Sequence, residues 1–285
     1  MPMALLLSSQ LAASMVGGSL QQRVFNAYGI DTMLVPTVNF ARHPGWGDPG
    51  GAVTEQPVFD SLLAGIESQG MFNLTDVVLT GYFADVGHVA SAARAMEAVR
   101  KAPRTINGLQ AFSAKPIRIV DPVMGDSPDG LFIAKSVAAA IIDQLLPHAD
   151  LVTPNLFELG YLTGRTLGDL DSMVRAARSL ARPVLVSSLP CQGRIGVMYV
   201  DEQQSWLVTH DRCPKAPHGT GDLLTAAFVS ARIRGMDVKS ALEQATAATY
   251  SIVKRANEWA SPELPVVAAD DVLKAPLIQL EAEAI

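Results

Sequence analysis

The turn from His218 to Asp222 carries the residues of this chain that are best suited to phosphoryl chemistry. It reads His-Gly-Thr-Gly-Asp and opens an apolar stretch of helical character. Because glycines let the backbone approach a ligand and helix starts bind anionic oxygens, Gly219, Thr220 and Gly221 are predicted to hold a transferred phosphoryl group. Asp222 is predicted to be the catalytic base that accepts a proton from a substrate hydroxyl. The alternative is an ordinary loop whose Asp caps the helix.

Asp121 and Asp126 lie in a second segment, which reads Asp-Pro-Val-Met-Gly-Asp and follows an apolar run over residues 117–120. In open α/β sheets, ligands bind at the carboxyl ends of the strands. A pair of carboxylates at such an end suits Mg²⁺, a hard cation that takes oxygen ligands and is often shared with phosphates. The alternative is a turn in which an Asp hydrogen-bonds its own backbone.

Two further strand ends offer polar side chains. Thr153, Asn155 and Glu158 follow the apolar run that begins at residue 151. Asn155 and Glu158 are three residues apart at a helix start, so both project to one side, toward the water shell of a metal and the phosphates. The same two residues also resemble a helix-capping pair. Ser187 and Ser188 end another apolar run and offer hydroxyls to a nucleotide.

These side chains need a sheet to bring them together, and the pattern of the chain predicts one. Of the 285 residues, 49% are hydrophobic and only 18% are charged, as expected where strands are covered on both faces. After a first buried strand at the N-terminus, strands are expected at residues 32–38, 77–80, 117–120, 151–153 and 184–187. Helices are expected at residues 16–28, 58–69, 86–100, 136–146, 155–162 and 170–180.

Strand and helix alternate up to residue 188, which predicts right-handed crossovers and an α/β fold. Its central sheet is expected to be mostly parallel, with helices on both faces. Beyond that residue, an antiparallel hairpin at the sheet edge is expected over residues 195–200 and 205–208, followed by helices over 221–234 and 238–258. No linker is long enough to divide the chain, so residues 1–285 are predicted to form a single domain.

The composition argues against several classes of partner. The formal net charge is −6 and no run of Lys and Arg occurs, which argues against nucleic acid or an anionic membrane. No stretch approaches the roughly 18 apolar residues of a membrane span, and the apolar start of the chain lacks the basic region of a signal peptide. Cys191 and Cys213 form no metal-ligand spacing and no disulfide framework, so we expect a cytoplasmic protein with non-catalytic cysteines. Walker A and G-x-G-x-x-G motifs are absent.

Together the motifs resemble those of the pyridoxal kinase family, in the ribokinase-like superfamily. The resemblance covers most of the chain and rests on five segments in matching order, which begin at Leu79, Asp121, Thr153, Ser187 and Gly219. It implies a ribokinase-like fold with a small lid or none. It also implies an ATP-dependent phosphotransferase that converts pyridoxal, pyridoxine or pyridoxamine to the 5′-phosphate in vitamin B6 salvage.

The resemblance further implies a role for each residue. Asp222 would deprotonate the 5′-hydroxymethyl group of pyridoxal, while Asp126 and Glu158 would bind Mg²⁺. Ser9, after the first strand, would hydrogen-bond the pyridine ring, and Tyr82 would pack near that ring. The residues around ATP and a monovalent cation, K⁺ or Na⁺, would be Asp121, Thr153, Asn155, Glu158, Ser187, Ser188 and Thr220. A homodimer is implied as well.

The N-terminal third departs from the family pattern in two segments, and the first reads Ser-Ser-Gln over residues 8–10 in place of the usual Gln-Ser-His. Where many pyridoxal kinases read Ser-Asn-His-Thr-Gly-Tyr, this chain reads Ala-Arg-His-Pro-Gly-Trp over residues 41–46. Pro44 replaces a substrate-contacting threonine and loses its hydroxyl, whereas His43 and Trp46 are still placed to cover the ring. His43 is equally well explained as a structural residue of the loop. The preferred vitamer stays open, as do two other functions: a hydroxymethylpyrimidine kinase and a non-catalytic protein that binds B6 vitamers.

Overall fold

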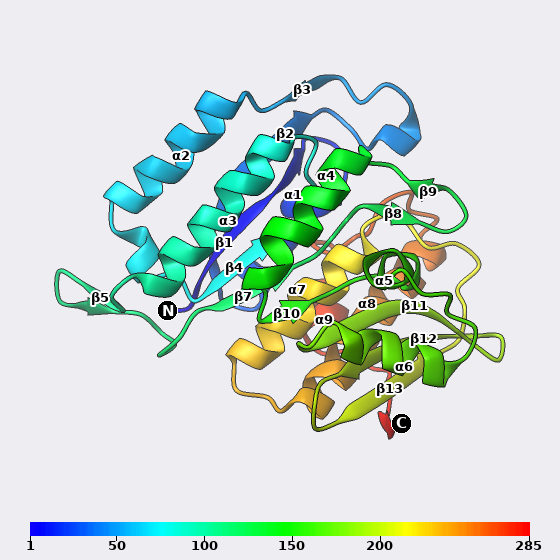
Figure 1. The fold of residues 1–285 in the computed structure, drawn as a ribbon. Coiled ribbons are helices and arrows are strands. Elements are labelled where there is room, and N and C mark those ends of the chain that lie inside the picture. The colour runs from blue at the N-terminus through cyan, green and yellow to red at the C-terminus, as the bar shows by residue number, and fades with distance from the viewer. The chain divides into compact units, whose positions relative to one another are not determined.

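The computed structural model describes all 285 residues, and the chain divides into two compact units. Unit 1 consists of Met1–Met124 and Leu131–Asp150. Unit 2 consists of Gly125–Gly130 and Leu151–Ile285. Strands alternate with helices along the chain in both units, which confirms the predicted α/β class (Figure 1).

Unit 1 is built on five strands in the order β7-β4-β1-β2-β3. The first four are parallel and β3 pairs antiparallel with β2. The central strand β1 reads Leu-Leu-Leu over residues 5–7, and all three side chains are fully buried because both of its faces are covered. The strands are β1 (Met3–Leu11), β2 (Asp31–Phe40), β3 (Gly51–Val53), β4 (Val77–Thr80), β7 (Ile117–Val120) and the separate hairpin of β5 (Thr105–Ile106) and β6 (Leu109–Gln110).

The helices of unit 1 cover both faces of its sheet, with α1 behind the strands and α2, α3 and α4 in front of them in Figure 1. The helix α3 begins after Asp85, whose carboxylate accepts a hydrogen bond from the Gly87 N–H at 2.6 Å. The α-helices are α1 (Gly17–Ala27), α2 (Gln56–Ser68), α3 (Val86–Lys101) and α4 (Lys135–Ala140). Shorter segments are η1 (Pro44–Trp46), η2 (Met71–Asn73), the π-helical η3 (Ile141–Leu145) and η4 (Leu146–His148).

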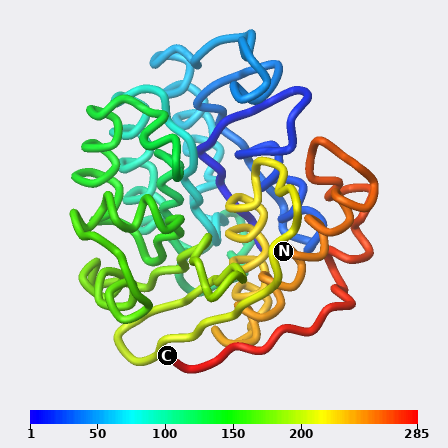
Figure 2. The backbone as a smooth tube through the Cα atoms, turned by 90° about the vertical axis from the view of Figure 1, so that its right-hand side faces the viewer, coloured from blue at the N-terminus to red at the C-terminus, as the bar shows by residue number.

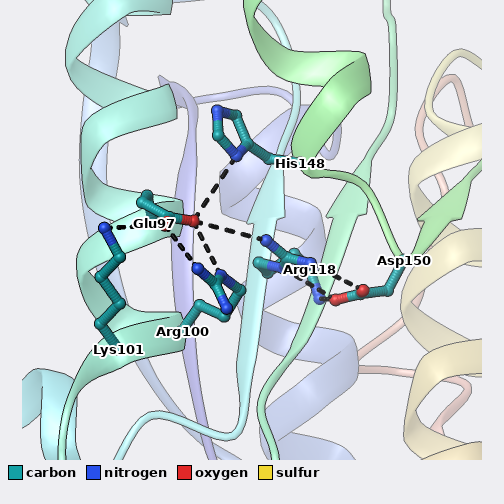
Figure 3. A network of polar contacts seen from close by, with 6 residues as sticks. All are labelled: Glu97, Arg100, Lys101, Arg118, His148 and Asp150. Carbon is teal, nitrogen blue, oxygen red and sulfur yellow. Dashed lines mark hydrogen bonds and ion pairs between the residues drawn. The ribbon is translucent and has the colours of Figure 1, made fainter.

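A network of polar contacts joins α3 to β7 and to the end of η4 in unit 1 (Figure 3). Glu97 of α3 contacts Arg100 at 2.6 Å and Lys101 at 3.0 Å, and lies 3.7 Å from the His148 ring. Arg118 of β7 pairs with Asp150 at 2.8 Å. The network therefore links α3, β7 and η4 at the surface of the unit.

Unit 2 has five strands in the order β14-β13-β12-β11-β10. The pair β10–β11 is parallel, whereas β11, β12, β13 and β14 pair antiparallel in turn. Figure 2 shows the C-terminal segment, in red, running beside β13. The strands are β10 (Leu151–Val152), β11 (Val184–Cys191), β12 (Arg194–Val200), β13 (Ser205–His210) and β14 (Glu283–Ala284), with β8 (Gly125–Asp126) and β9 (Gly130–Leu131) at the boundary of the units.

Five helices belong to unit 2, and the longest, α8, packs against α7, β12 and β13. The alanines at 241, 245 and 248 of α8 are fully buried, as a period of 3.6 residues requires of one helix face. The helices are α5 (Leu156–Thr163), α6 (Leu170–Ser179), α7 (Thr220–Ile233), α8 (Val238–Glu258) and α9 (Asp270–Lys274). None of the helices in either unit is long and apolar enough to cross a membrane.

Three expectations need correction. Ser9 lies inside β1 rather than after it, because β1 continues to Leu11 although the apolar run stops at residue 7. The predicted hairpin β12–β13 is antiparallel but is not at the edge, because β14 pairs with β13 through Trp206 and Leu207. The helix expected over residues 136–146 ends at Ala140 and continues as a π-helix.

Candidate active site

The predicted phosphoryl-binding turn opens α7 in unit 2. Gly219 is the residue before the helix and has a left-handed backbone, with φ of 92°, which glycine adopts at little cost. Thr220 and Gly221 are the first two helical residues, so their N–H groups have no partner within the helix. Asp222 follows in the first turn and is half-buried. The positive end of the helix dipole favours the ionised carboxylate there, as a proton acceptor requires.

Asn155 and Glu158 form a capping box at the start of α5, which confirms the structural alternative for these residues. The Asn155 side chain accepts from the Glu158 N–H at 2.9 Å, and the Glu158 carboxylate accepts from the Asn155 N–H at 2.9 Å. The second Glu158 oxygen accepts from the Gly125 N–H at 3.4 Å. The Asn155 amide donates to the Gly125 carbonyl at 2.8 Å. The start of α5 therefore also holds the turn that carries Asp126.

Asp126 follows Gly125 directly and is exposed, with one carboxylate oxygen accepting from the Ser127 N–H at 2.8 Å. Glu158, by contrast, is only 3% exposed. A Cβ atom at Gly125 would lie 2.4 Å from the Phe157 ring and 2.6 Å from the Gly130 carbonyl oxygen, so only glycine fits. The two acids are thus held close in the fold by one tightly packed turn. Oxygen donors of this kind suit Mg²⁺, which keeps several waters and shares substrate phosphates.

The ends of β10 and β11 lie side by side. Asn155 and Ser187 form a parallel bridge, and the Ser187 N–H donates to the Pro154 carbonyl at 3.1 Å. Thr153, at the end of β10, has a buried hydroxyl without a hydrogen-bond partner. Ser188 has φ of 65°, an uncommon conformation for a residue other than glycine. Backbone strain of this kind clusters at functional sites, where it aims a side chain.

A cavity of about 180 Å³ lies within unit 2, and four of the predicted residues line it. These are Ser187, Ser188, Thr220 and Gly221. The cavity therefore links the strand end that was predicted to bind ATP with the turn that was predicted to bind its phosphates.

The remaining walls of the cavity are mostly apolar and aromatic. His210 stacks on Tyr250, with ring centroids 4.5 Å apart and planes at 29°. Burial lowers the pKa of His210, which favours the neutral ring. Val197 and Leu224 add apolar surface. A flat aromatic heterocycle is the kind of ligand that such walls accept.

In unit 1, the backbone at Gly17 packs closely on Ser9, and the backbone at Gly81, next to Tyr82, packs closely on Ser8. Ser9 is 5% exposed, and a Cβ atom at Gly17 would lie 2.0 Å from its hydroxyl oxygen. A Cβ atom at Gly81, next to Tyr82, would lie 2.3 Å from the hydroxyl oxygen of Ser8. Burial raises the pKa of the Tyr82 phenol, which therefore stays protonated. The two serines are therefore held against the backbone at Gly17 and Gly81.

His43 and Pro44 form the start of the short helix η1 in unit 1. The Nδ1 atom of His43 accepts a hydrogen bond from the Gly45 N–H at 3.0 Å, so its ring caps this turn. The His43 N–H donates to the Ser14 hydroxyl at 3.0 Å. These bonds confirm a structural role for His43 in the loop. Pro44 is exposed, and Trp46 is 46% exposed.

Asp121 follows β7 in unit 1 and is 6% exposed. Its N–H donates to the Thr80 carbonyl at 3.1 Å, which extends the pairing of β7 with β4. Val123, two residues later, has φ of 40°. That value is an outlier for a β-branched residue, and such outliers persist only where the surrounding structure enforces them. The segment after β7 is therefore held in a strained, defined conformation.

The predicted residues thus fall into two groups. Unit 2 brings together the strand ends, the capping box and the α7 turn, and unit 1 holds Ser9, His43, Pro44, Tyr82 and Asp121. The cavity walls on β12 and α8 went unpredicted, since they come from elements far apart in the sequence. Their one visible signal is a pair of threonines, Thr246 and Thr249, in an alanine-rich helix. The segment from His210 to Pro217 is placed near the adenine by the family resemblance alone, and part of it lines the cavity.

Known proteins of similar sequence are named as kinases. The family model described as phosphomethylpyrimidine kinase matches residues 88–266. A protein named pyridoxal kinase PdxY from Leifsonia xyli is 30% identical over 275 residues, covering 93% of each chain. Another of that name from Deinococcus radiodurans is 33% identical, covering 90% of this chain and 87% of the relative.

Solved structures show the same fold. Pyridoxal kinase from Leishmania donovani in complex with ADP and pyridoxamine has a TM-score of 0.90 at 22% identity, covering both chains in full. Pyridoxal kinase from Entamoeba histolytica has a TM-score of 0.89 at 20% identity, covering 100% of this chain and 99% of the other. The sequence relatives and the shared α/β fold agree with the motifs described above. The chain belongs to the pyridoxal kinase family of the ribokinase-like superfamily.

Proposed function

We propose that this protein transfers the γ-phosphoryl group of ATP to the 5′-hydroxyl of pyridoxal, pyridoxine or pyridoxamine in vitamin B6 salvage. The observation that carries the proposal is the cavity of unit 2, which reaches Thr220 and Gly221 at the start of α7. A nucleotide in this cavity has its phosphates next to the half-buried Asp222. Relatives that are at least 30% identical over most of this chain are named pyridoxal kinases, which supports the choice of acceptor.

The α7 turn supplies most of the chemistry in this proposal. Phosphoryl transfer depends chiefly on positioning and on stabilisation of charge. The N–H groups of Gly219, Thr220 and Gly221 hold the transferred group, because the helix start offers donors and a positive dipole end. Asp222 takes the proton of the attacking hydroxyl as the new oxygen–phosphorus bond forms.

Nucleotide and cations are assigned to the other strand ends. Asp126 and Glu158 would hold Mg²⁺, since Glu158 of α5 bonds to the packed turn that carries Asp126 and both offer oxygen donors. The metal would neutralise the charge of the phosphates. A monovalent cation, K⁺ or Na⁺, is part of the proposal by resemblance. The nucleotide is contacted by the remaining predicted residues Asp121, Thr153, Asn155, Ser187, Ser188 and Thr220.

The acceptor is assigned to residues of unit 1. Ser9 hydrogen-bonds the pyridine ring and Tyr82 packs near it. His43 and Pro44 form the adjoining wall, where His43 also caps η1 through its Nδ1 atom. The proposal treats residues 1–285 as a single kinase domain, acting as a cytoplasmic homodimer. Two free cysteines, Cys191 and Cys213, are consistent with a reducing compartment.

The test is a side-by-side assay of phosphoryl transfer with Mg-ATP. Pyridoxal, pyridoxine, pyridoxamine and hydroxymethylpyrimidine are supplied separately, and both ADP and the phosphorylated product are quantified. We expect kcat/KM to be highest for a B6 vitamer. The second candidate is the hydroxymethylpyrimidine kinase, which the phosphomethylpyrimidine kinase family model favours. A preference for the pyrimidine would select it, and tight binding of pyridoxal without release of ADP would select a binding protein.

A further inference from the structure

The helix α8 carries three buried hydroxyls that make no hydrogen bond, those of Thr246, Thr249 and Ser251. A serine or threonine inside a helix ordinarily donates to the carbonyl four residues earlier. Ser230 in α7 does so, with its hydroxyl 2.7 Å from the Ala226 carbonyl oxygen. The three hydroxyls of α8 are therefore exceptions, because each lacks the hydrogen bond that a buried polar group ordinarily makes.

Two of the three hydroxyl-bearing residues line the cavity of unit 2, and the third does not. Thr246 and Thr249 belong to its walls, together with Tyr250. Thr246 is 1% exposed. The two threonines are three residues apart, so they lie on neighbouring turns of the same helix face. A ligand in the cavity would meet both side chains along one edge.

A buried hydroxyl without a partner destabilises the ligand-free protein, because its hydrogen bonds to water have been lost and not replaced. Such a cost is retained at positions where a ligand supplies the missing bond. Threonine in a helix has two accessible χ1 rotamers, so a change of rotamer can turn the hydroxyl toward a ligand. The stacked rings of His210 and Tyr250 provide a flat wall of the same cavity.

We propose that Thr246 and Thr249 are specificity-determining residues that hydrogen-bond the edge of the nucleotide base. The inference rests on the proposed function, because it needs a nucleotide in this cavity. A hydroxyl both donates and accepts and rotates to suit its partner. Two hydroxyls therefore satisfy the edge of adenine and of guanine alike. The phosphoryl donor is therefore a purine nucleoside triphosphate. The KM values for ATP and GTP are expected to lie within about tenfold of each other.

The decisive variants are Thr246→Val and Thr249→Val, which replace the hydroxyl by a methyl group of similar shape. Each is expected to raise the melting temperature of the ligand-free protein, because an unpaired polar group is removed. Each is also expected to raise the KM for ATP about tenfold, as the loss of one hydrogen bond implies, with kcat within about twofold. Opposite effects on stability and on nucleotide binding are not expected of residues with a merely structural role.

Two control variants sharpen the test. Ser251→Ala removes an unpartnered hydroxyl of the same helix that does not line the cavity, and its KM for ATP should equal that of the wild type. Thr246→Ser keeps a hydroxyl and should restore tight binding. If Ser251→Ala weakens binding as much as the threonine variants do, or if Thr246→Ser fails to restore it, the inference is overturned.

Calorimetric titration with ADP separates this inference from the proposed function. The dissociation constant for ADP is measured without any acceptor, so it is informative even if pyridoxal is not phosphorylated. Failure of pyridoxal phosphorylation with normal ADP binding contradicts the proposed function alone. ADP binding in Thr246→Val and Thr249→Val that matches the wild type, or a gap between ATP and GTP well beyond tenfold, contradicts the inference.

Discussion

Gly81 is a residue of unit 1 at which the packing leaves no room for a Cβ atom. An added Cβ atom would lie 2.3 Å from the hydroxyl oxygen of Ser8 and 3.0 Å from the Ser8 Cβ atom. Ser8 is fully buried in β1, so it has little room to move away. Because Tyr82 follows Gly81 and Ser9 follows Ser8, the same close approach sets the positions of two residues assigned to the acceptor. The glycine therefore bears on both stability and substrate binding.

We expect Gly81→Ala to lower the free energy of unfolding by about 1–3 kcal/mol, as overpacking of a core does. We also expect it to raise the KM for pyridoxal. Gly65→Ala is the matched control, because Gly65 lies in α2 with nothing within 4 Å of an added Cβ atom. That exchange should stabilise the protein slightly through helix propensity. Urea unfolding compares the two, and equal stability of both variants would contradict the steric argument.

His88 is a fully buried titratable residue of unit 1, stacked on Phe59 with ring centroids 4.4 Å apart. Burial lowers the pKa of His88. The charges of Asp85 and Asp60 and an interaction with the Thr54 backbone act in the opposite direction but do not offset this effect. The folded protein thus favours the neutral ring, whereas the unfolded chain takes up a proton below about pH 6.5. The contribution to stability is complete above that pH and is lost as the pH falls below it.

The variant His88→Leu removes this titration and keeps a side chain of similar size at the buried position. Between pH 7.5 and pH 5 we expect the melting temperature of the wild type to fall further than that of the variant. Burial also lowers the pKa of His210, so the variant should reduce the pH dependence rather than abolish it. Identical pH profiles of wild type and variant would show that His88 does not titrate as its burial implies.

The start of α5 combines a structural and a proposed catalytic role in one element. Glu158 closes the capping box through its bond to the Asn155 N–H. It also accepts from the Gly125 N–H beside Asp126. The two roles differ in what they require, since capping needs only an acceptor oxygen and metal binding needs the negative charge.

Glu158→Gln separates the roles, because glutamine also closes a capping box. We expect its melting temperature to stay close to that of the wild type, while the Mg²⁺ concentration for half-maximal activity rises at least tenfold. Asn155→Ala should lose about 1 kcal/mol of stability, the usual effect of losing an N-cap. If Glu158→Gln needs no additional Mg²⁺, Glu158 serves only as a cap.

The network around Glu97 ties α3 to neighbouring elements of unit 1 (Figure 3). Hydrogen bonds from Arg100 and Lys101 hold the pKa of Glu97 well below its ordinary value. We expect Glu97→Gln to lower the melting temperature by roughly 1–3 °C in dilute buffer, with the difference shrinking in 1 M salt, where charges are screened beyond about 3 Å. Glu67→Gln, at an exposed position of α2, is the control. A difference that does not respond to salt would argue against an electrostatic origin.

For the whole molecule, the elements that the sequence predicted best are the long or strongly apolar ones. The bounds of β4, β7 and α8 match the expectations, because each has a clear apolar period or a run bounded by turn-forming residues. The strands β3 and β14 went unpredicted. They have three and two residues, all exposed, so they show no apolar pattern and depend on pairing with a longer strand.

The candidate site was likewise predictable from the sequence only in part. The α7 turn and the capping residues of α5 are local in sequence, so their geometry could be predicted from spacing alone. The cavity could not, because its walls come from β11, β12, β13, α7 and α8, and only the folded unit 2 brings them together. The cost of the unpaired hydroxyls at Thr246 and Thr249 is likewise invisible until burial is known.

The central claim is that Asp222 acts as the base in phosphoryl transfer to pyridoxal. Its most direct test is the turnover of Asp222→Asn with pyridoxal and Mg-ATP, alongside its affinity for ADP. Asp171→Asn, an exposed acid in the first turn of α6, controls for the loss of a charge at a helix start. We predict that kcat falls by about 10²- to 10⁴-fold in Asp222→Asn alone, with ADP affinity nearly unchanged. Wild-type turnover in Asp222→Asn would contradict the claim.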